Sequence, residues 1–116
     1  MTTYHIDNYR FGKITVSGVS YTRDLIILPK LIISDWWRKK GHLLQLDDLS
    51  DVLKLRPDLL IIGLGASSRM QLAPDVGSAL TEAGIKWTAL PTGDACREFN
   101  RKAPEIETAA ALHLTC

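Results

Sequence analysis

The stretch Asp58-Leu59-Leu60-Ile61-Ile62-Gly63 decides the fold of this chain. It is a short, continuous run of large apolar residues that ends in a glycine. Such a run is typical of a strand that is covered on both faces, as in a parallel sheet. Pro57 ends the helical pattern before it, because the residue that precedes a proline disfavours helical backbone. We therefore predict an interior strand over residues 58–62, with a parallel neighbour on each side.

Helices and strands alternate after this run. Pro74 suits the first turn of a helix, and Gly84 suits its end. Residues 86–90 then predict a second strand, and Thr92 is placed to cap the helix that follows it. Alternating side chains between residues 106 and 114 predict a closing strand. Because strand–helix–strand units make right-handed crossovers between parallel strands, the C-terminal part is predicted to be a βαβαβ unit.

The N-terminal part has the pattern of antiparallel strands. Short runs rich in β-branched and aromatic residues are separated by turn residues such as Ser17-Gly18. These runs cover residues 11–16, 19–21, 24–28 and 31–33. Asp47 or Asp48 is then placed to cap a short helix before the apolar run. Together the two parts predict one α/β domain over residues 1–116, with a mixed sheet.

The composition excludes several classes of protein. Apolar residues make up 46% and charged residues 23% of the chain, as in ordinary globular proteins. The net charge of +1 creates no field that draws the chain to nucleic acid or to anionic lipid. The longest apolar stretch, residues 25–33, is far shorter than the roughly 20 residues of a membrane span. We expect a cytoplasmic protein with reduced thiols, no nucleic-acid partner and no membrane insertion.

No metal site or catalytic constellation stands out. The two cysteines, Cys96 and Cys116, and the three scattered histidines lack the spacing of zinc ligands. Cys96 lies on the apolar stripe of the last helix, which predicts an inert, buried thiol rather than a nucleophile. Trp36-Trp37 precede three basic residues, and we favour one buried tryptophan and one at an edge or a protein contact over a nucleic-acid contact. We expect no metal and no cofactor, and we lean against enzyme activity.

The loop after the apolar run is the candidate ligand site. In a parallel pair this loop and the helix start at Thr92 lie at the same end of the sheet, where α/β folds bind ligands. Glycines let backbone amides approach an anion, and hydroxyls, a guanidinium and a helix start add to such a site. Asp94 opposes an anion there, and a glycine turn needed only for packing is the alternative. The candidate ligand-binding residues are Gly63, Gly65, Ser67, Ser68, Arg69 and Thr92.

An ordered set of short motifs along nearly the whole chain resembles a known family. No motif is specific alone, but their order and spacing together are. They are Phe11-Gly12, Tyr21-x-x-Asp24, Trp36-x-Arg38, Gly41-His42, Ile62-Gly63-x-Gly65, Gly84-Ile85, Thr92-x-x-Ala95, Phe99-Asn100 and Ala109-Ala110-Ala111-Leu112-His113-x-Thr115-Cys116. The chain is similar to the small Mth-type domains of unknown function. That family includes a mitochondrial respiratory complex I assembly factor and an adipogenesis-associated protein. The segment 103–107 departs from the family, whose members often carry a Gly-Arg or Arg-Arg pair just before the last strand.

The resemblance implies a compact three-layer α/β fold with a mixed central sheet, no established enzyme activity and no cofactor. It also implies a protein that acts through contacts with a protein partner, as its assembly-type relatives do. Our first hypothesis is therefore a non-catalytic interaction or assembly-type protein. The alternative is a small-ligand or anion-binding protein, an enzyme included, that uses the crevice at Gly63–Arg69 and Thr92.

Overall fold

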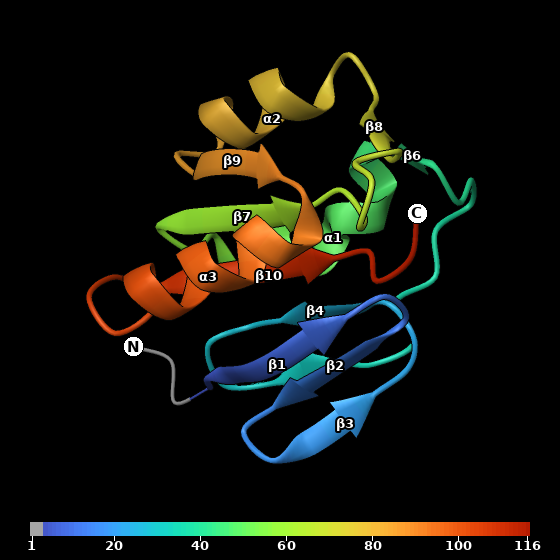
Figure 1. The fold of residues 1–116 in the computed structure, drawn as a ribbon. Helices are drawn as coiled ribbons and strands as arrows, with labels where there is room; N and C mark the ends of the chain where they lie inside the picture. Colours follow the sequence, from blue (N-terminus) through green and yellow to red (C-terminus); the bar gives the residue numbers. More distant parts are fainter. Residues whose placement is uncertain (1–3) are drawn as a thin grey trace.

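The N-terminal strands form an antiparallel sheet on one side of the molecule (Figure 1). In the computed structural model, which describes residues 4–116, the pairing order is β1 (Ile6–Arg10), β2 (Lys13–Val16) and β3 (Val19–Tyr21). Gly12 and Gly18 lie in the two turns, with positive φ angles of 78° and 84° that L side chains rarely adopt. The predicted antiparallel meander is therefore present here, and β1 extends it toward the N-terminus.

The main sheet among the described residues has the strand order β5-β4-β10-β7-β9. Its strands are β4 (Leu25–Ile27), β5 (Ile32–Ile33), β7 (Leu59–Gly63), β9 (Lys86–Leu90) and β10 (Thr108–Leu112). β7 lies between β10 and β9 and is parallel to both, which confirms the predicted interior strand. β4 is antiparallel to both β10 and β5, so the sheet is mixed. β4 thus pairs with the C-terminal strands rather than with β3, because its three apolar residues are buried on both faces.

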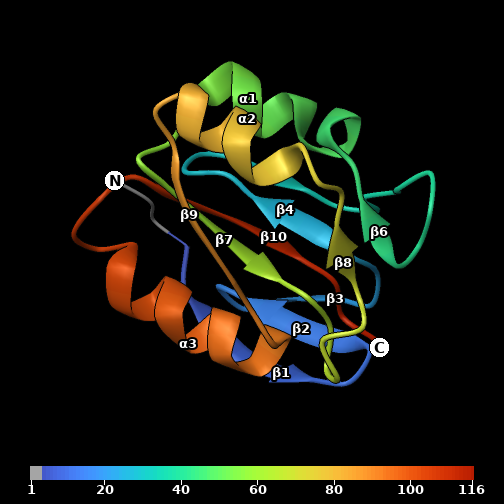
Figure 2. The ribbon, with the colours of Figure 1, turned by 90° about the horizontal axis from the view of Figure 1, so that it is seen from above.

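Helices cover both faces of the main sheet, as Figure 2 shows. α1 (Ser50–Leu55), which continues the 3-10 helix η1 (Leu46–Leu49), and α2 (Val76–Glu82) lie over one face. α3 (Thr92–Lys102) lies over the other face and also packs against β1. The chain therefore has the expected three layers, with a mixed sheet in the middle and the units β7-α2-β9-α3-β10 in the C-terminal part.

Buried apolar side chains fill the space on each side of the main sheet. One group lies among the main sheet, α3 and the β1–β3 sheet, and it includes Ile61 and Phe99. The other lies between the main sheet and helices α1 and α2, and it includes Leu60 and Leu80. Leu60 and Ile61 are both fully buried, and they point to opposite sides of β7 as the pleat of a strand requires. β10, predicted as the closing strand, occupies the middle of the sheet, and all of its residues are buried.

The start of the first helix and the loop ends complete the fold. Asp48, one of the two predicted capping residues, lies inside the first turn of η1, where its carboxylate accepts a hydrogen bond from the amide of Gln45 at 2.8 Å. A short parallel pair, β6 (Leu43–Leu44) and β8 (Gln71–Leu72), joins two connecting segments. Across residues 4–116, no helix has the length and apolar character needed to cross a bilayer.

Candidate functional site

The segment Ser34–Gly41, which we call the tryptophan segment, leads from β5 toward β6 and presents one tryptophan to solvent. Its side chains alternate: Trp36 and Arg38 are each 7% exposed, whereas Trp37 is 80% exposed. The Trp36 amide donates to the carbonyl of Asp24 at 2.8 Å, and its indole Nε1 donates to the carbonyl of Asp48 at 3.0 Å. One tryptophan of the pair is therefore buried, as expected, and the anchored residues on both sides of Trp37 hold its backbone so that its side chain faces solvent.

Arg38 anchors the far side of Trp37 through a buried polar cluster. Its Nη2 donates to Asp24 Oδ2 at 2.6 Å and to the carbonyl of Gly41 at 3.0 Å. The same carboxylate oxygen accepts from His113 Nδ1 at 2.7 Å, and the other accepts from the amide of Leu114 at 2.7 Å. Asp24, Arg38 and His113, which we call the Asp24 cluster, thus join the loop before β4, the tryptophan segment and the residues after β10.

The electrostatics of the Asp24 cluster favour an ionised carboxylate. Burial acts to raise the pKa of Asp24, but the hydrogen bonds from His113, the Leu114 amide and Arg38 outweigh it, so the pKa lies below its ordinary value. An ionised carboxylate can only accept, so Asp24 accepts from His113 Nδ1, and the same nitrogen also lies 3.1 Å from Arg38 Nη2.

Two buried nitrogen atoms of this cluster have no hydrogen-bond partner among the described residues. They are Arg38 Nη1 and His113 Nε2. The Arg38 guanidinium stacks 4.7 Å from the centre of the Trp36 ring, and the His113 ring meets the exposed His42 ring edge-on at 5.7 Å between centres. The Trp36 ring lies against the face of the guanidinium, so it does not accept a hydrogen bond from Arg38 Nη1. Arg38 therefore has donor capacity that the chain itself does not use.

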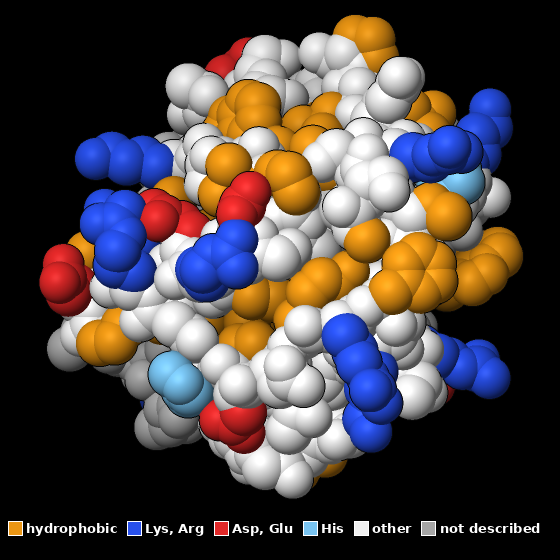
Figure 3. Space-filling view, viewed as in Figure 1, with side chains coloured by type: hydrophobic (Ala, Val, Ile, Leu, Met, Phe, Trp, Pro, Cys, Tyr) orange, Lys and Arg blue, Asp and Glu red, His pale blue; other side chains and the backbone are white. Residues whose placement is uncertain are grey.

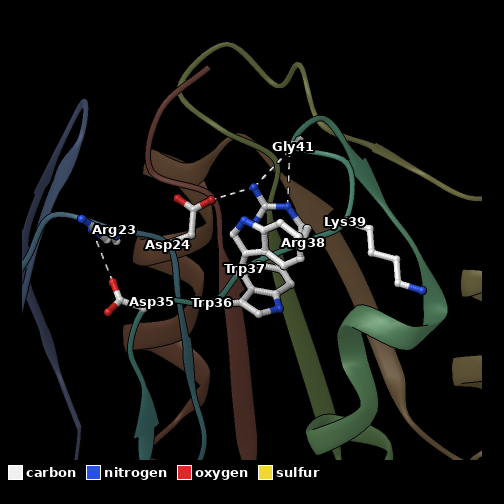
Figure 4. A pocket seen from close by; sticks show the side chains of 8 residues that line it. All are labelled: Arg23, Asp24, Asp35, Trp36, Trp37, Arg38, Lys39 and Gly41. Atoms are coloured by element: carbon white, nitrogen blue, oxygen red, sulfur yellow. Dashed lines mark hydrogen bonds and ion pairs between the residues drawn. The ribbon is translucent and has the colours of Figure 1, made fainter.

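A pocket of about 570 Å³ opens beside the tryptophan segment (Figure 4). Its lining combines two indole rings with charges of both signs. Arg23 and Asp35 form an exposed ion pair at 3.5 Å on its rim, and Lys39 lies 3.9 Å from Asp47. The lining residues are Arg23, Asp24, Asp35, Trp36, Trp37, Arg38, Lys39 and Gly41. In the view of Figure 3, large apolar side chains stand out on the edge of the molecule over which the tryptophan segment runs, with basic side chains above and below.

The predicted ligand residues Gly63, Gly65 and Thr92 are brought together, but largely to bind other parts of the chain. The Thr92 hydroxyl accepts from the Gly65 amide at 2.8 Å and donates to the His113 carbonyl at 2.6 Å. Thr92 is therefore not the cap of α3, which Pro91 precedes, because its fully buried hydroxyl is used across the sheet end instead. A Cβ on Gly65 would lie 2.2 Å from the backbone carbon of Cys116, so the glycine is needed for close packing.

The C-terminal residues also occupy backbone amides of the predicted anion loop. The Ala66 amide donates to the Thr115 carbonyl at 2.6 Å, and the Arg69 amide donates to the Cys116 carbonyl at 3.0 Å. The side chains of Ser67, Ser68 and Arg69 are exposed, so these side chains, rather than the Ala66 and Arg69 amides, are open to a ligand from solvent. Anion binding by this loop stays a prediction.

Cys96 and Cys116 are free thiols in different surroundings. Cys96 is 5% exposed in the core, and burial raises the pKa of its thiol to about 12. A thiol of this kind holds almost no thiolate at neutral pH, which fits the predicted inert cysteine. No group of three or more His, Cys, Asp or Glu side chains within residues 4–116 is arranged to hold a metal ion.

Reasoning from the sequence did not identify the Asp24 cluster as a unit. Its members are single polar residues, and the sequence separation of Asp24 and His113 is 89 positions. A signal exists, because Asp24 directly precedes the apolar residues of β4 and His113 directly follows those of β10. Polar residues at the ends of two fully buried strands meet when those strands pair, as β4 and β10 do.

Comparison with solved structures finds the same fold in bacteria and archaea. The conserved hypothetical protein PH1505 from Pyrococcus horikoshii matches with a TM-score of 0.81 and 22% identity, covering 96% of this chain and 98% of that one. A protein from Bartonella henselae, described as an outer membrane protein, matches with a TM-score of 0.84 and 26% identity, covering 99% and 98%. A Mth938-like domain from Bordetella pertussis matches with a TM-score of 0.70 and 18% identity, covering 95% and 85%.

The family comparison agrees with the fold comparison and with the motifs. A model described as "Protein of unknown function (DUF498/DUF598)" matches residues 6–113, which span β1 through the histidine of the Asp24 cluster. The chain therefore belongs to this family of small Mth-type domains of unknown function.

Proposed function

We propose that this protein is a non-catalytic interaction module that binds a protein partner through Trp37 and the rim of the pocket beside it. The observation that carries the proposal is the exposure of Trp37 between two buried anchors. Tryptophan and arginine are enriched among the residues that contribute most to protein interfaces. A tryptophan offers a large contact area with only two side-chain torsions to fix, and the anchored neighbours limit the backbone freedom that is lost on binding.

The backbone around Trp37 supports a surface that is formed before binding. Asp35 has a φ of 54°, a left-handed conformation that costs roughly 1–3 kcal/mol for a residue other than glycine. The hydrogen bonds of Trp36 and Arg38 hold the segment in this conformation. These contacts stabilise a loop conformation that exposes the indole of Trp37 to solvent.

The chemistry around the pocket supports binding rather than catalysis. Asp24 and His113 resemble two members of a nucleophilic triad, in which a carboxylate orients an imidazole. Their Oδ2–Nδ1 contact is part of the buried Asp24 cluster, however, which also binds Arg38. His113 Nε2, the atom that would act as the base of a triad, is buried without a partner. No hydroxyl or thiol nucleophile is hydrogen-bonded to that nitrogen among the described residues.

Site-specific crosslinking in the native host tests this proposal. A photoreactive phenylalanine analogue replaces Trp37 in one strain and Phe11 in another. Phe11 is the matched control, because it is also an exposed aromatic residue, at 63%, but it lies in the turn between β1 and β2. We expect a defined protein adduct from position 37 that is absent from position 11. Identical adduct patterns at both positions, or none at position 37, would reject Trp37 as the contact residue.

The second candidate function is anion binding at the loop Gly63–Arg69. It is favoured by Arg69, whose exposed side chain has no ion pair with an acidic side chain among the described residues. Phosphate titration at constant ionic strength tests it, with the melting temperature of wild type compared with that of Arg69→Ala. Stabilisation of wild type alone supports an anion site at Arg69, whereas equal stabilisation of both proteins, or of neither, argues against it.

A further inference from the structure

The rim of the pocket beside Trp37 carries more positive than negative charge. Arg23, Lys39 and Lys40 are exposed cations on or next to this rim, whereas Asp35 and Asp47 are the acids that pair with the first two. Lys40 has no acidic partner within residues 4–116. Both rim pairs are exposed and long, at 3.5 and 3.9 Å, so each contributes little and is readily exchanged for another acid.

One residue that lines the same pocket has an unused donor. Arg38 lines the pocket, and its side chain is 4% exposed. Its Nη1 is buried and donates to no acceptor among the described residues. A buried N–H without an acceptor costs free energy, and a carboxylate oxygen supplied to the pocket is the acceptor that a guanidinium binds best. The unused donor and the rim charges therefore point to the same ligand chemistry.

We infer that the partner presents an acidic segment, with an apolar side chain that packs on Trp37 and a neighbouring Asp or Glu that enters the pocket toward Arg38. This inference rests on the proposed function, because it names the chemistry of the partner that Trp37 contacts. The indole alone would also stack with a cation of the partner. A basic segment is disfavoured, because the exposed Lys39 and Lys40 lie within three residues of Trp37 in the chain and would repel it.

Selection from a library of short random peptides tests the inference. Displayed peptides are selected on immobilised wild-type protein after depletion on Trp37→Ala, so that only peptides that need the indole survive. We expect the enriched peptides to carry more Asp and Glu than Lys and Arg, next to an apolar residue. The affinity of one synthesised winner is then measured by fluorescence anisotropy, at rising NaCl concentrations that screen charge pairs.

Two double variants separate local charge from net charge. Lys39→Glu/Lys40→Glu reverses the charge of two lysines at the rim. Lys54→Glu/Lys86→Glu makes the same change in net charge on exposed residues elsewhere: Lys54 lies on α1, and Lys86 lies on β9, at the opposite edge of the sheet from β5. We expect the first variant to bind the acidic peptide about tenfold more weakly or worse. The second should bind it as wild type does. Melting temperatures of both variants equal to that of wild type show that neither change acts through folding.

The outcomes separate this inference from the proposed function. Enrichment of neutral or basic peptides that still require Trp37 overturns the inference of an acidic segment but agrees with the proposed interaction module. An absence of any enrichment that depends on Trp37 overturns both. Displacement of the acidic peptide by free N-acetylglutamate at equal affinity would assign the pocket to small carboxylates, and this also overturns the inference of a protein segment.

Discussion

The carboxylate of Asp24 lies 2.7 Å from His113 Nδ1, across a sequence separation of 89 residues. This contact closes the fold at the end of the pairing between β4 and β10. The same carboxylate also receives Arg38, the residue that follows Trp37. One side chain therefore connects the central strands of the sheet to the segment that presents the exposed indole, and its loss has consequences for both.

Asp24→Asn is expected to lower the free energy of unfolding by about 3 kcal/mol or more, because it leaves the buried Arg38 without its anion. Urea denaturation followed by circular dichroism measures the change. Asp35→Asn is the control: its ion pair with Arg23 joins side chains that are 68% and 78% exposed, and exposed pairs contribute about 0–1 kcal/mol. A loss in Asp24→Asn as small as that in Asp35→Asn would show that the cluster does not stabilise the fold.

The pH dependence of stability should carry the signature of Asp24. Because its pKa is lower in the folded protein than the ordinary value of 3.8, the unfolded chain binds the proton more readily at acidic pH. The stabilisation is therefore fully present above that value and is lost as the pH falls through the folded pKa. We expect the difference in free energy of unfolding between wild type and Asp24→Asn to be constant near neutrality and to shrink below about pH 4. A difference that grows on acidification would contradict the assigned sign.

Truncation of the interior strand should be costly on both faces of the sheet. Leu60→Ala and Ile61→Ala each remove a fully buried side chain, and we expect each to lower the free energy of unfolding by roughly 2–5 kcal/mol. Leu55→Ala at the end of α1, where the side chain is 43% exposed, is the matched control and should cost much less. Chemical denaturation of the three variants provides the comparison. Equal losses in all three would contradict the interior position of β7.

The two thiols should differ in their rate of reaction with a disulfide reagent in the native state. Cys116 is partly exposed and should react quickly, whereas Cys96 should react only through opening of the structure, because burial raises its pKa to about 12. In Cys116→Ser the fast phase should disappear, and denaturant should restore one reactive thiol. A fast phase that persists in this variant would reveal an accessible Cys96.

Much of the sheet could be predicted from local patterns. The run 58–63 identifies an interior strand because unbroken apolar residues require cover on both faces, and residues 86–90 and 92–102 follow as a strand and a helix. The position of β10 between β4 and β7 could not be predicted, because strand order depends on contacts between distant segments. The predicted ligand residues Gly63, Gly65 and Thr92 do meet, as parallel strand ends must, but the pattern does not reveal that the chain's own C-terminal residues bond there.

The surface around Trp37 was harder to predict for a physical reason. The tryptophan segment lies outside the named helices and strands, and its conformation depends on Arg38, whose partner Asp24 lies in the loop before β4. The adjacent pair Trp36-Trp37 indicates only that one ring is buried in an extended chain. Which ring is exposed depends on the hydrogen bond from Trp36 Nε1 to the carbonyl of Asp48.

One measurement tests the central claim most directly: the affinity of the crosslinked partner for two variants of this protein, Trp37→Ala and Phe11→Ala. Both variants remove an exposed aromatic ring, so they should share the stability of wild type, as thermal unfolding verifies. If Trp37 is the anchor of the interface, isothermal titration calorimetry should show a loss of about 30-fold or more in Trp37→Ala, which corresponds to about 2 kcal/mol, and wild-type affinity in Phe11→Ala. Equal affinities of the two variants for the partner would contradict the account.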